Sequence, residues 1–142
     1  MNRSFLIVAA AVAVAVAGAL VIRAAADDDK GSQGREQAFR EAERKTSAAY
    51  DCMPRDVRRR FDAAVKRYDA RFGRVIDGLP DDTDPQDAER ALRADARVTR
   101  LRAQARGILL DYVPGGEKFD RECYERAVKR YDSRVERNEP AR

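Results

Sequence analysis

Apolar residues recur in this chain at alternating steps of three and four, which is the spacing of one face of an α-helix. The pattern is strongest in two stretches, about 54–79 and 84–112. The stripe of the first stretch consists of Phe61, Val65, Tyr68, Phe72, Val75 and Leu79. That of the second consists of Ala91, Ala94, Val98, Leu101, Ala105, Ile108 and Tyr112. The sequence has no strand-like alternation of useful length, so the predicted fold class is all-α.

Proline and glycine divide the chain into four predicted helices, at about 33–50, 54–79, 84–112 and 118–137. The heptad steps favour shallow crossing angles. We therefore expect a small antiparallel four-helix bundle over residues 35–137, followed by a disordered tail at 138–142. An alternative is one continuous helix kinked at Pro54, which gives three long helices.

An eight-residue motif occurs twice, as AVKRYDAR at 64–71 and as AVKRYDSR at 127–134. Identity at all but one position favours a duplicated helical hairpin over chance. The valine and the tyrosine of one copy should therefore occupy the same core positions as those of the other copy.

Residues 5–22 contain no polar side chain and follow Arg3, which is the pattern of a secretory signal. A retained membrane anchor is the alternative, because 18 apolar residues lie at the lower limit of a bilayer span. We expect residues 1–26 to be one or the other, and 27–34 to be a polar tether. In both cases the basic N-terminus stays inside, so the rest of the chain is predicted to be exported, as a periplasmic, secreted or outward-facing anchored protein.

Cys52 and Cys123 are the two cysteines of the chain. An exported domain is oxidised, so we expect them to form a structural disulfide. The chain has no C-x-x-C spacing and no histidine, which argues against a redox pair or a thiolate metal site. No cofactor is predicted.

Arginine is the only lead to a function, with 24 Arg against 5 Lys in the chain. Guanidinium groups bind carboxylate and phosphate in a bidentate manner. Helical spacing places two arginine rows on the second and third predicted helices. The candidate anion- or partner-binding residues are Arg60, Arg67, Arg71, Arg74, Arg90, Arg93, Arg97 and Arg100. The alternative is a solvated surface with ion pairs inside each helix.

The acidic segment 77–89 suggests a cation site, but its spacing is not that of an EF-hand and Pro85 interrupts it. Capping of the next helix explains Asp84 and Asp87 without a metal. We therefore predict no metal ligands here.

Enzyme activity is not predicted. The absence of histidine excludes His-based catalysis, and no serine of the exported part lies in a nucleophile motif. Nucleic acid is disfavoured as a partner, since no aromatic residues alternate with the arginine rows. The sequence favours a non-enzymatic interaction module that binds a protein or an anionic envelope component. The second hypothesis is a structural or assembly protein that self-associates or forms a membrane-tethered coiled coil, with membrane contact through 5–22.

Overall fold

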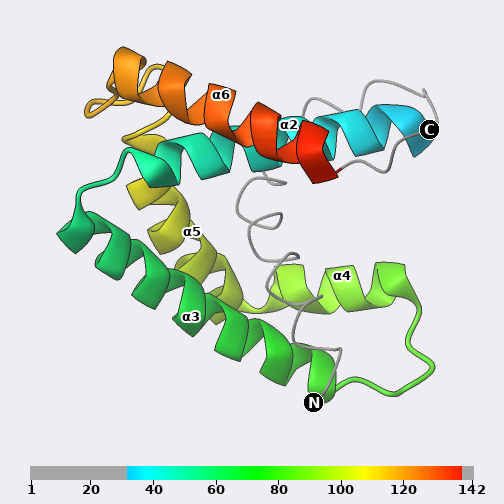
Figure 1. Cartoon of the computed structure of the whole chain (residues 1–142). Helices are drawn as coiled ribbons and strands as arrows, with labels where there is room; N and C mark the ends of the chain where they lie inside the picture. The colour runs from blue at the N-terminus through cyan, green and yellow to red at the C-terminus, as the bar shows by residue number, and fades with distance from the viewer. Residues whose placement is uncertain (1–31, 139–142) are drawn as a thin grey trace. The chain divides into compact units, whose positions relative to one another are not determined.

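The computed structural model describes residues 32–138, which form five α-helices and no strand (Figure 1). The predicted all-α class is therefore confirmed. The helices are α2 (Ser32–Asp51), α3 (Arg55–Asp77), α4 (Pro85–Ala94), α5 (Ala96–Leu110) and α6 (Arg121–Asn138). None of these helices is long and apolar enough to cross a membrane. The segment 5–22, on which the export prediction depends, lies outside the described residues.

The third predicted helix is two helices, because Asp95 ends α4 and begins α5. Its backbone is extended (φ −78°, ψ 105°), and its N–H donates to the carbonyl oxygen of Ala91 at 3.2 Å. Its carboxylate accepts the N–H of Val98 at 2.9 Å, as an N-cap residue does. The prediction of one helix over 84–112, and with it the count of four, is wrong.

The alternative of a continuous helix kinked at Pro54 is also wrong. The helix α2 ends at Asp51, and the next two residues turn away from its axis. The N–H of Cys52 donates to the Ala49 carbonyl oxygen, and that of Met53 to the Tyr50 carbonyl oxygen, both at 3.1 Å. These tightened bonds satisfy the last carbonyl groups of α2 and leave Cys52 just beyond its end.

A glycine turn separates α5 from α6. Gly115 has a φ of 89°, which disfavours any residue with a side chain. A Cβ atom on Gly116 would lie 2.2 Å from the carbonyl oxygen of Leu110, so the close approach of the backbone requires glycine. Asp120 then accepts the N–H of Cys123 at 3.0 Å, which places Cys123 in the first turn of α6.

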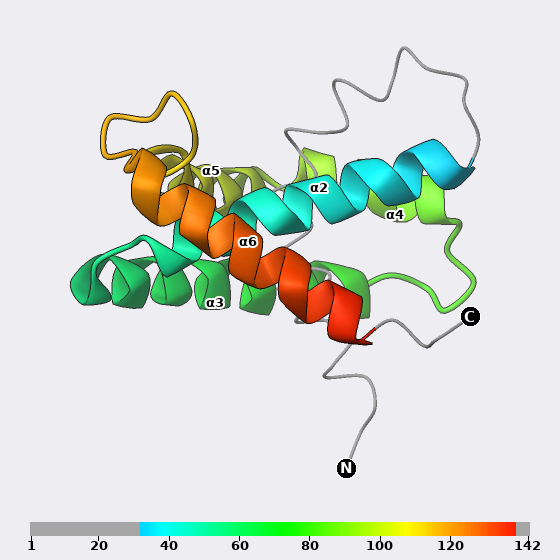
Figure 2. The same cartoon turned by 45° about the horizontal axis from the view of Figure 1, so that its top comes forward.

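The chain forms two compact units. Unit 1 combines the described parts of Met1–Pro54 and Leu109–Arg142, and α2 and α6 lie side by side in it (Figures 1 and 2). Its buried residues are Ala42, Thr46, Ala48, Ala49, Met53, Leu109, Tyr112 and Ala127. Unit 2, Arg55–Ile108, contains α3, α4 and most of α5. Its buried residues are Val57, Phe61, Ala64, Tyr68, Val98, Leu101 and Ala105.

The two copies of the repeated motif are both helical, one in α3 and one in α6. Their alanines, Ala64 and Ala127, are equally buried at 1% exposure. The expected equivalence is wrong at the tyrosines. Tyr68 is fully buried, whereas Tyr131 is half-buried and its hydroxyl donates to Glu43 at 3.0 Å. The difference arises because Tyr68 is covered inside unit 2, while Tyr131 lies at the edge of the α2–α6 contact.

Candidate functional site

Three predicted arginines, Arg60, Arg67 and Arg74, form a row along one side of α3, since a spacing of seven returns to nearly the same side of a helix. All three are exposed. Within residues 32–138 none of them makes a hydrogen bond or an ion pair. We call these three residues the α3 row. In the part of the chain that the structure describes, nothing occupies the donors of its guanidinium groups.

Arg71 was predicted to join this row, but it is bound to Asp95 inside unit 2. Its Nη2 lies 2.6 Å and its Nε 3.3 Å from the two carboxylate oxygens of Asp95. The hydrogen bond from Arg71, together with that from the N–H of Val98, lowers the pKa of Asp95 to about 2. This pair ties α3 to the junction of α4 and α5, and it removes Arg71 from the candidate site.

The second predicted row is divided by the break at Asp95. Arg90 and Arg93 lie on α4 and form ion pairs with Asp87 and Glu89 of the same helix. For these two residues the alternative interpretation, a solvated surface with ion pairs inside the helix, is therefore correct.

Arg97 and Arg100 lie on α5 and are exposed. Neither has a hydrogen-bonding or ionic partner in the described part of the chain. Of the eight predicted binding residues, five therefore have no ionic or hydrogen-bonding partner for their guanidinium groups among residues 32–138, three on α3 and two on α5.

The opposite flank of α5 carries a further arginine that the sequence analysis did not select. Nη2 of Arg102 donates to the hydroxyl of Tyr68 at 3.4 Å, and its guanidinium carbon lies 5.7 Å from the centre of that ring. Arg102 packs α5 against α3, so its role is structural.

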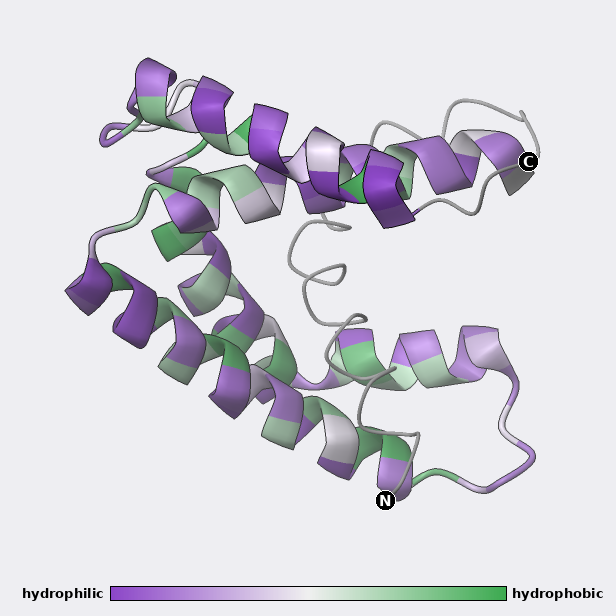
Figure 3. Cartoon of the chain, viewed as in Figure 1, coloured by the Kyte–Doolittle hydropathy of each residue, from purple (hydrophilic) through white to green (hydrophobic). Residues whose placement is uncertain are grey.

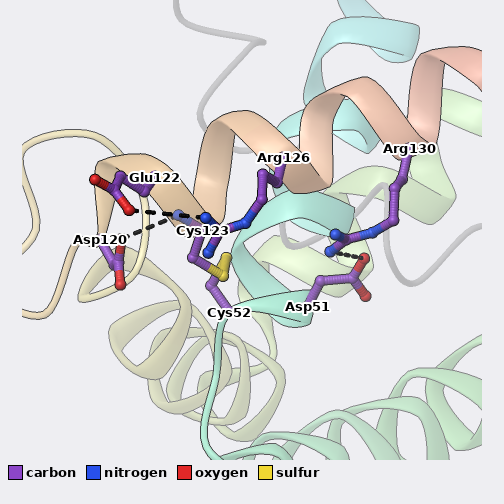
Figure 4. Close-up of a disulfide and its surroundings, with 7 residues drawn as sticks. All are labelled: Asp51, Cys52, Asp120, Glu122, Cys123, Arg126 and Arg130. Carbon is purple, nitrogen blue, oxygen red and sulfur yellow. Dashed lines mark hydrogen bonds and ion pairs between the residues drawn. A yellow bond between two sulfur atoms is a disulfide. The ribbon is translucent and has the colours of Figure 1, made fainter.

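The predicted disulfide is present and joins the end of α2 to the first turn of α6 (Figure 4). The sulfur atoms of Cys52 and Cys123 are 2.17 Å apart and their Cα atoms 5.9 Å apart. Beside it, Arg130 of α6 lies 3.6 Å from a carboxylate oxygen of Asp51 (Figure 4). The disulfide therefore holds the two helices of unit 1 together at one end.

Polar contacts also join the second half of α2 to α6. Arg44 donates from Nε and Nη2 to the two oxygens of Asp132, at 2.8 and 2.7 Å. The hydrogen bond to Asp132 raises the pKa of Arg44. Burial, with the hydrogen bond to Glu43, raises the pKa of Tyr131 to about 12. These contacts fix which side of α6 faces away from α2.

Asp69 is the counterpart of Asp132 in the first copy of the motif, but it has no such partner. Its Oδ1 is buried and accepts no hydrogen bond. Burial raises the pKa of Asp69 to about 6. The alignment of the two motif copies was the signal that could have singled out these two aspartates.

A cationic flank of α6 was also missed by the sequence analysis. Four basic side chains and one serine line a shallow, open hollow on this helix: Lys129, Arg130, Ser133, Arg134 and Arg137. We call these five residues the α6 face. It escaped notice because a count of charges, six basic against four acidic residues in α6, does not show on which side of the helix each lies.

The acidic segment before α4 serves that helix. Asp84 is the N-cap and accepts the N–H of Gln86 at 2.8 Å, and Asp87 pairs with Arg90. Among residues 32–138, no three cysteine or acidic side chains are grouped closely enough to hold a metal ion.

Comparisons of the chain with models of protein families, with characterised proteins and with solved structures found no match. The function must therefore be argued from the residues and their geometry alone.

Proposed function

We propose that the chain is an exported, non-enzymatic interaction module that binds an anionic or protein partner through arginine-bearing faces of its helices. The observation that carries this proposal is the α3 row, three exposed guanidinium groups on one side of a helix with no partner among the described residues. Arg97 and Arg100 of α5 extend the same property within unit 2.

Within residues 32–138 the α3 row makes no intrahelical ion pair, unlike several other exposed basic residues of the chain. Four exposed basic residues of α4 and α2 are paired with acids three or four positions away: Arg40, Lys45, Arg90 and Arg93. An unpaired guanidinium group offers a carboxylate or a phosphate two parallel hydrogen bonds without first breaking an existing ion pair. Such a surface suits a ligand with repeated negative charges.

Export of the chain and its origin from a duplicated helical hairpin are parts of the same proposal. The apolar segment 5–22 supports export, and the disulfide is the kind of bond that persists in an oxidising compartment. The repeated motif, with its equally buried alanines Ala64 and Ala127, supports a duplicated helical hairpin as the origin of the helices.

The test begins with fractionation of cells that express the tagged chain and sequencing of the N-terminus of the product. A start at Gly18 or Asp27 indicates a cleaved signal, and an intact N-terminus in the membrane fraction indicates an anchor. Recovery of the full-length chain from cytosol, with both thiols free, would contradict the proposal.

Partner binding is then tested by crosslinking in the recovered compartment, with the α3 row changed to glutamine. The matched control carries three glutamine substitutions at exposed arginines elsewhere, namely Arg35, Arg59 and Arg121. We expect crosslinked products to be lost with the first variant and at high salt, and to be kept with the control. Equal loss in both variants would indicate a general charge effect and contradict the site.

A second candidate function, a structural or assembly protein, is favoured by α4. This helix has an apolar side, yet none of its residues is buried, and Ala88, Ala91 and Leu92 are half-exposed. Light scattering after gel filtration tests it. A mass above that of the monomer, reduced by Leu92→Glu, supports assembly, and a monomer at all concentrations refutes it.

A further inference from the structure

The α6 face is a surface that the proposed function does not use. Its residues recur at steps of one, three and four, so that they lie along one flank of α6. In Figure 3 most of the ribbon of this helix has the colour of hydrophilic residues. From Lys129 to Arg137 the face is about 12 Å long.

The positive charges of this face are weakly compensated. Lys129 and Arg137 make no ion pair or hydrogen bond through their side chains within residues 32–138. Arg134 reaches Ser47 Oγ at 3.5 Å, the outer limit of a hydrogen bond, and the ion pair of Arg130 with Asp51 is long at 3.6 Å.

Two of the four acidic residues of α6 are bound to other cations, and the other two, Glu125 and Glu136, make no ion pair with the face within residues 32–138. Asp132 is bound to Arg44 of α2, and Glu122 pairs with Arg126 in the first turns of the helix. No acidic side chain is among the residues that line the hollow. The helix therefore has six basic and four acidic residues, and all the charged side chains that line the hollow are basic.

The face is also held in place. The disulfide fixes the first turn of α6 to the end of α2, and the bidentate contact of Arg44 with Asp132 fixes its middle. Four cations are thus presented on a supported helix, where binding does not have to order the backbone.

We propose that the α6 face lies against an anionic lipid surface. A row of single charges about 12 Å long matches a plane of singly charged headgroups better than it matches one compact multivalent anion. The length of chain before α2 supports this occupant. Only residues 23–31 separate the apolar segment 5–22 from α2, and they span about 30 Å at most when fully extended.

A few basic residues give only weak binding to an anionic leaflet, about fivefold in affinity for each Lys or Arg. Stable attachment needs a second signal, which the apolar segment 5–22 supplies. The inference therefore rests on the retained-anchor form of the proposed function, which an N-terminus starting at Gly18 or Asp27 would overturn, and not on the α3 row. The tether raises the local concentration of lipid headgroups around unit 1. The α6 face can therefore bind them although its affinity for each is weak.

The chain contains no tryptophan, which provides a direct assay. Ser133 is exposed at the centre of the α6 face, and its hydroxyl donates to the carbonyl oxygen of Lys129 in its own helix. The full chain with Ser133→Trp is mixed with vesicles of phosphatidylcholine alone, or of phosphatidylcholine with phosphatidylglycerol. We expect a shift of the emission to shorter wavelength, and quenching by brominated lipid, only with the anionic vesicles and only at low salt.

Two further variants of this chain have the same net charge and differ only in where the charge is lost. Replacing Lys129, Arg134 and Arg137 by glutamine should weaken binding of the α6 face to the vesicle surface about 100-fold. Replacing the α3 row by glutamine should leave the emission shift unchanged. Circular dichroism on the oxidised chains checks that all variants keep their helices.

The same emission in neutral and anionic vesicles would overturn the proposal, and so would equal loss of the shift in both triple variants. A shift that soluble polyglutamate reproduces at the same charge concentration would assign the face to an acidic protein, and would also overturn it. The assay uses purified components. Its failure therefore leaves the crosslinking test of the α3 row untouched, and failure of that test leaves this one untouched.

Discussion

The same substitution at the two aspartates of the repeated motif should change stability in opposite directions. Asp69→Asn is expected to stabilise the protein at neutral pH, because it removes a charge whose Oδ1 is buried without a hydrogen bond. Asp132→Asn is expected to destabilise it, because both oxygens of Asp132 accept hydrogen bonds from Arg44.

The magnitude for Asp69 follows from its pKa, which burial raises from 3.8 to about 6. At about 1.4 kcal/mol for each pH unit, that is about 3 kcal/mol against the ionised form. Because the side chain keeps contact with solvent, we reduce the expected effect to about 1–2 kcal/mol. For Asp132, whose pair with Arg44 is nearly half exposed, the expected loss is about 0.5–1 kcal/mol.

The pH dependence gives a second, independent check on Asp69. A folded-state pKa above the unfolded value means that the folded protein binds more protons between about 3.8 and 6. The stability of the native chain should therefore fall as pH rises through this range, and the full penalty is present above it. The advantage of Asp69→Asn should be largest at neutral pH and vanish towards pH 3.8, where the native carboxyl is itself neutral.

The assay is urea denaturation of the oxidised chains, followed by circular dichroism at neutral pH and at about pH 4. A loss of stability in Asp69→Asn at neutral pH would refute the reasoning. A gain that is the same at both pH values would also refute it, because the effect would then not depend on ionisation.

Three further predictions concern the stability of the two units. Reduction of the Cys52–Cys123 disulfide should cost about 4 kcal/mol by the loop-entropy relation, and an unchanged urea midpoint would contradict this. Asp95→Ala should lower the unfolding midpoint, because it removes the partner of Arg71 and the N-cap of α5. Since the pKa of Asp95 is lowered to about 2, its contribution is present above pH 3.8 and lost as pH falls towards 2, so an acid titration should show the two chains converging there. Gly107→Ala should add about 0.5–1 kcal/mol, because the new Cβ meets nothing within 4 Å, and a lower thermal midpoint would show that the backbone there is strained.

The features that the sequence predicts correctly depend on local signals. Pro85 and the Gly115–Gly116 pair mark helix ends because each restricts the backbone whatever surrounds it. The disulfide follows from there being only two cysteines. Together with the apolar periodicity, these signals suffice for the all-α class and for the approximate ends of α2, α3 and α6.

The break at Asp95 was not predicted, because the apolar stripe continues through it from Ala91 to Val98. Periodicity reports which side of a helix is covered, but it does not report where a carboxylate caps a new helix. Asp95 is the one acidic residue in an arginine-rich stretch, 90–106, and that isolation was the available signal. Its partner, Arg71, is 24 residues away, which no local pattern reveals.

The candidate site shows the same limit. Helical spacing predicts which arginines share a side, and the α3 row keeps that arrangement. Spacing cannot predict which of them a distant carboxylate will bind, as Asp95 binds Arg71. The α6 face was missed for the converse reason. Here a distant arginine, Arg44 of α2, binds an acidic residue of α6, Asp132, and leaves basic side chains of α6 in excess.

The order of the two units along the chain has a consequence for biogenesis. Unit 2 is one continuous segment, Arg55–Ile108, while the two parts of unit 1 lie before and after it. During synthesis unit 2 is therefore complete before α6 exists, whereas α2 must wait for its partner helix. Once the cysteines are joined, the polypeptide is a covalent ring with two tails, and unit 2 lies wholly within the ring. A protease that nicks the loop between α3 and α4 would then leave the fragments attached, and only a reductant would release them.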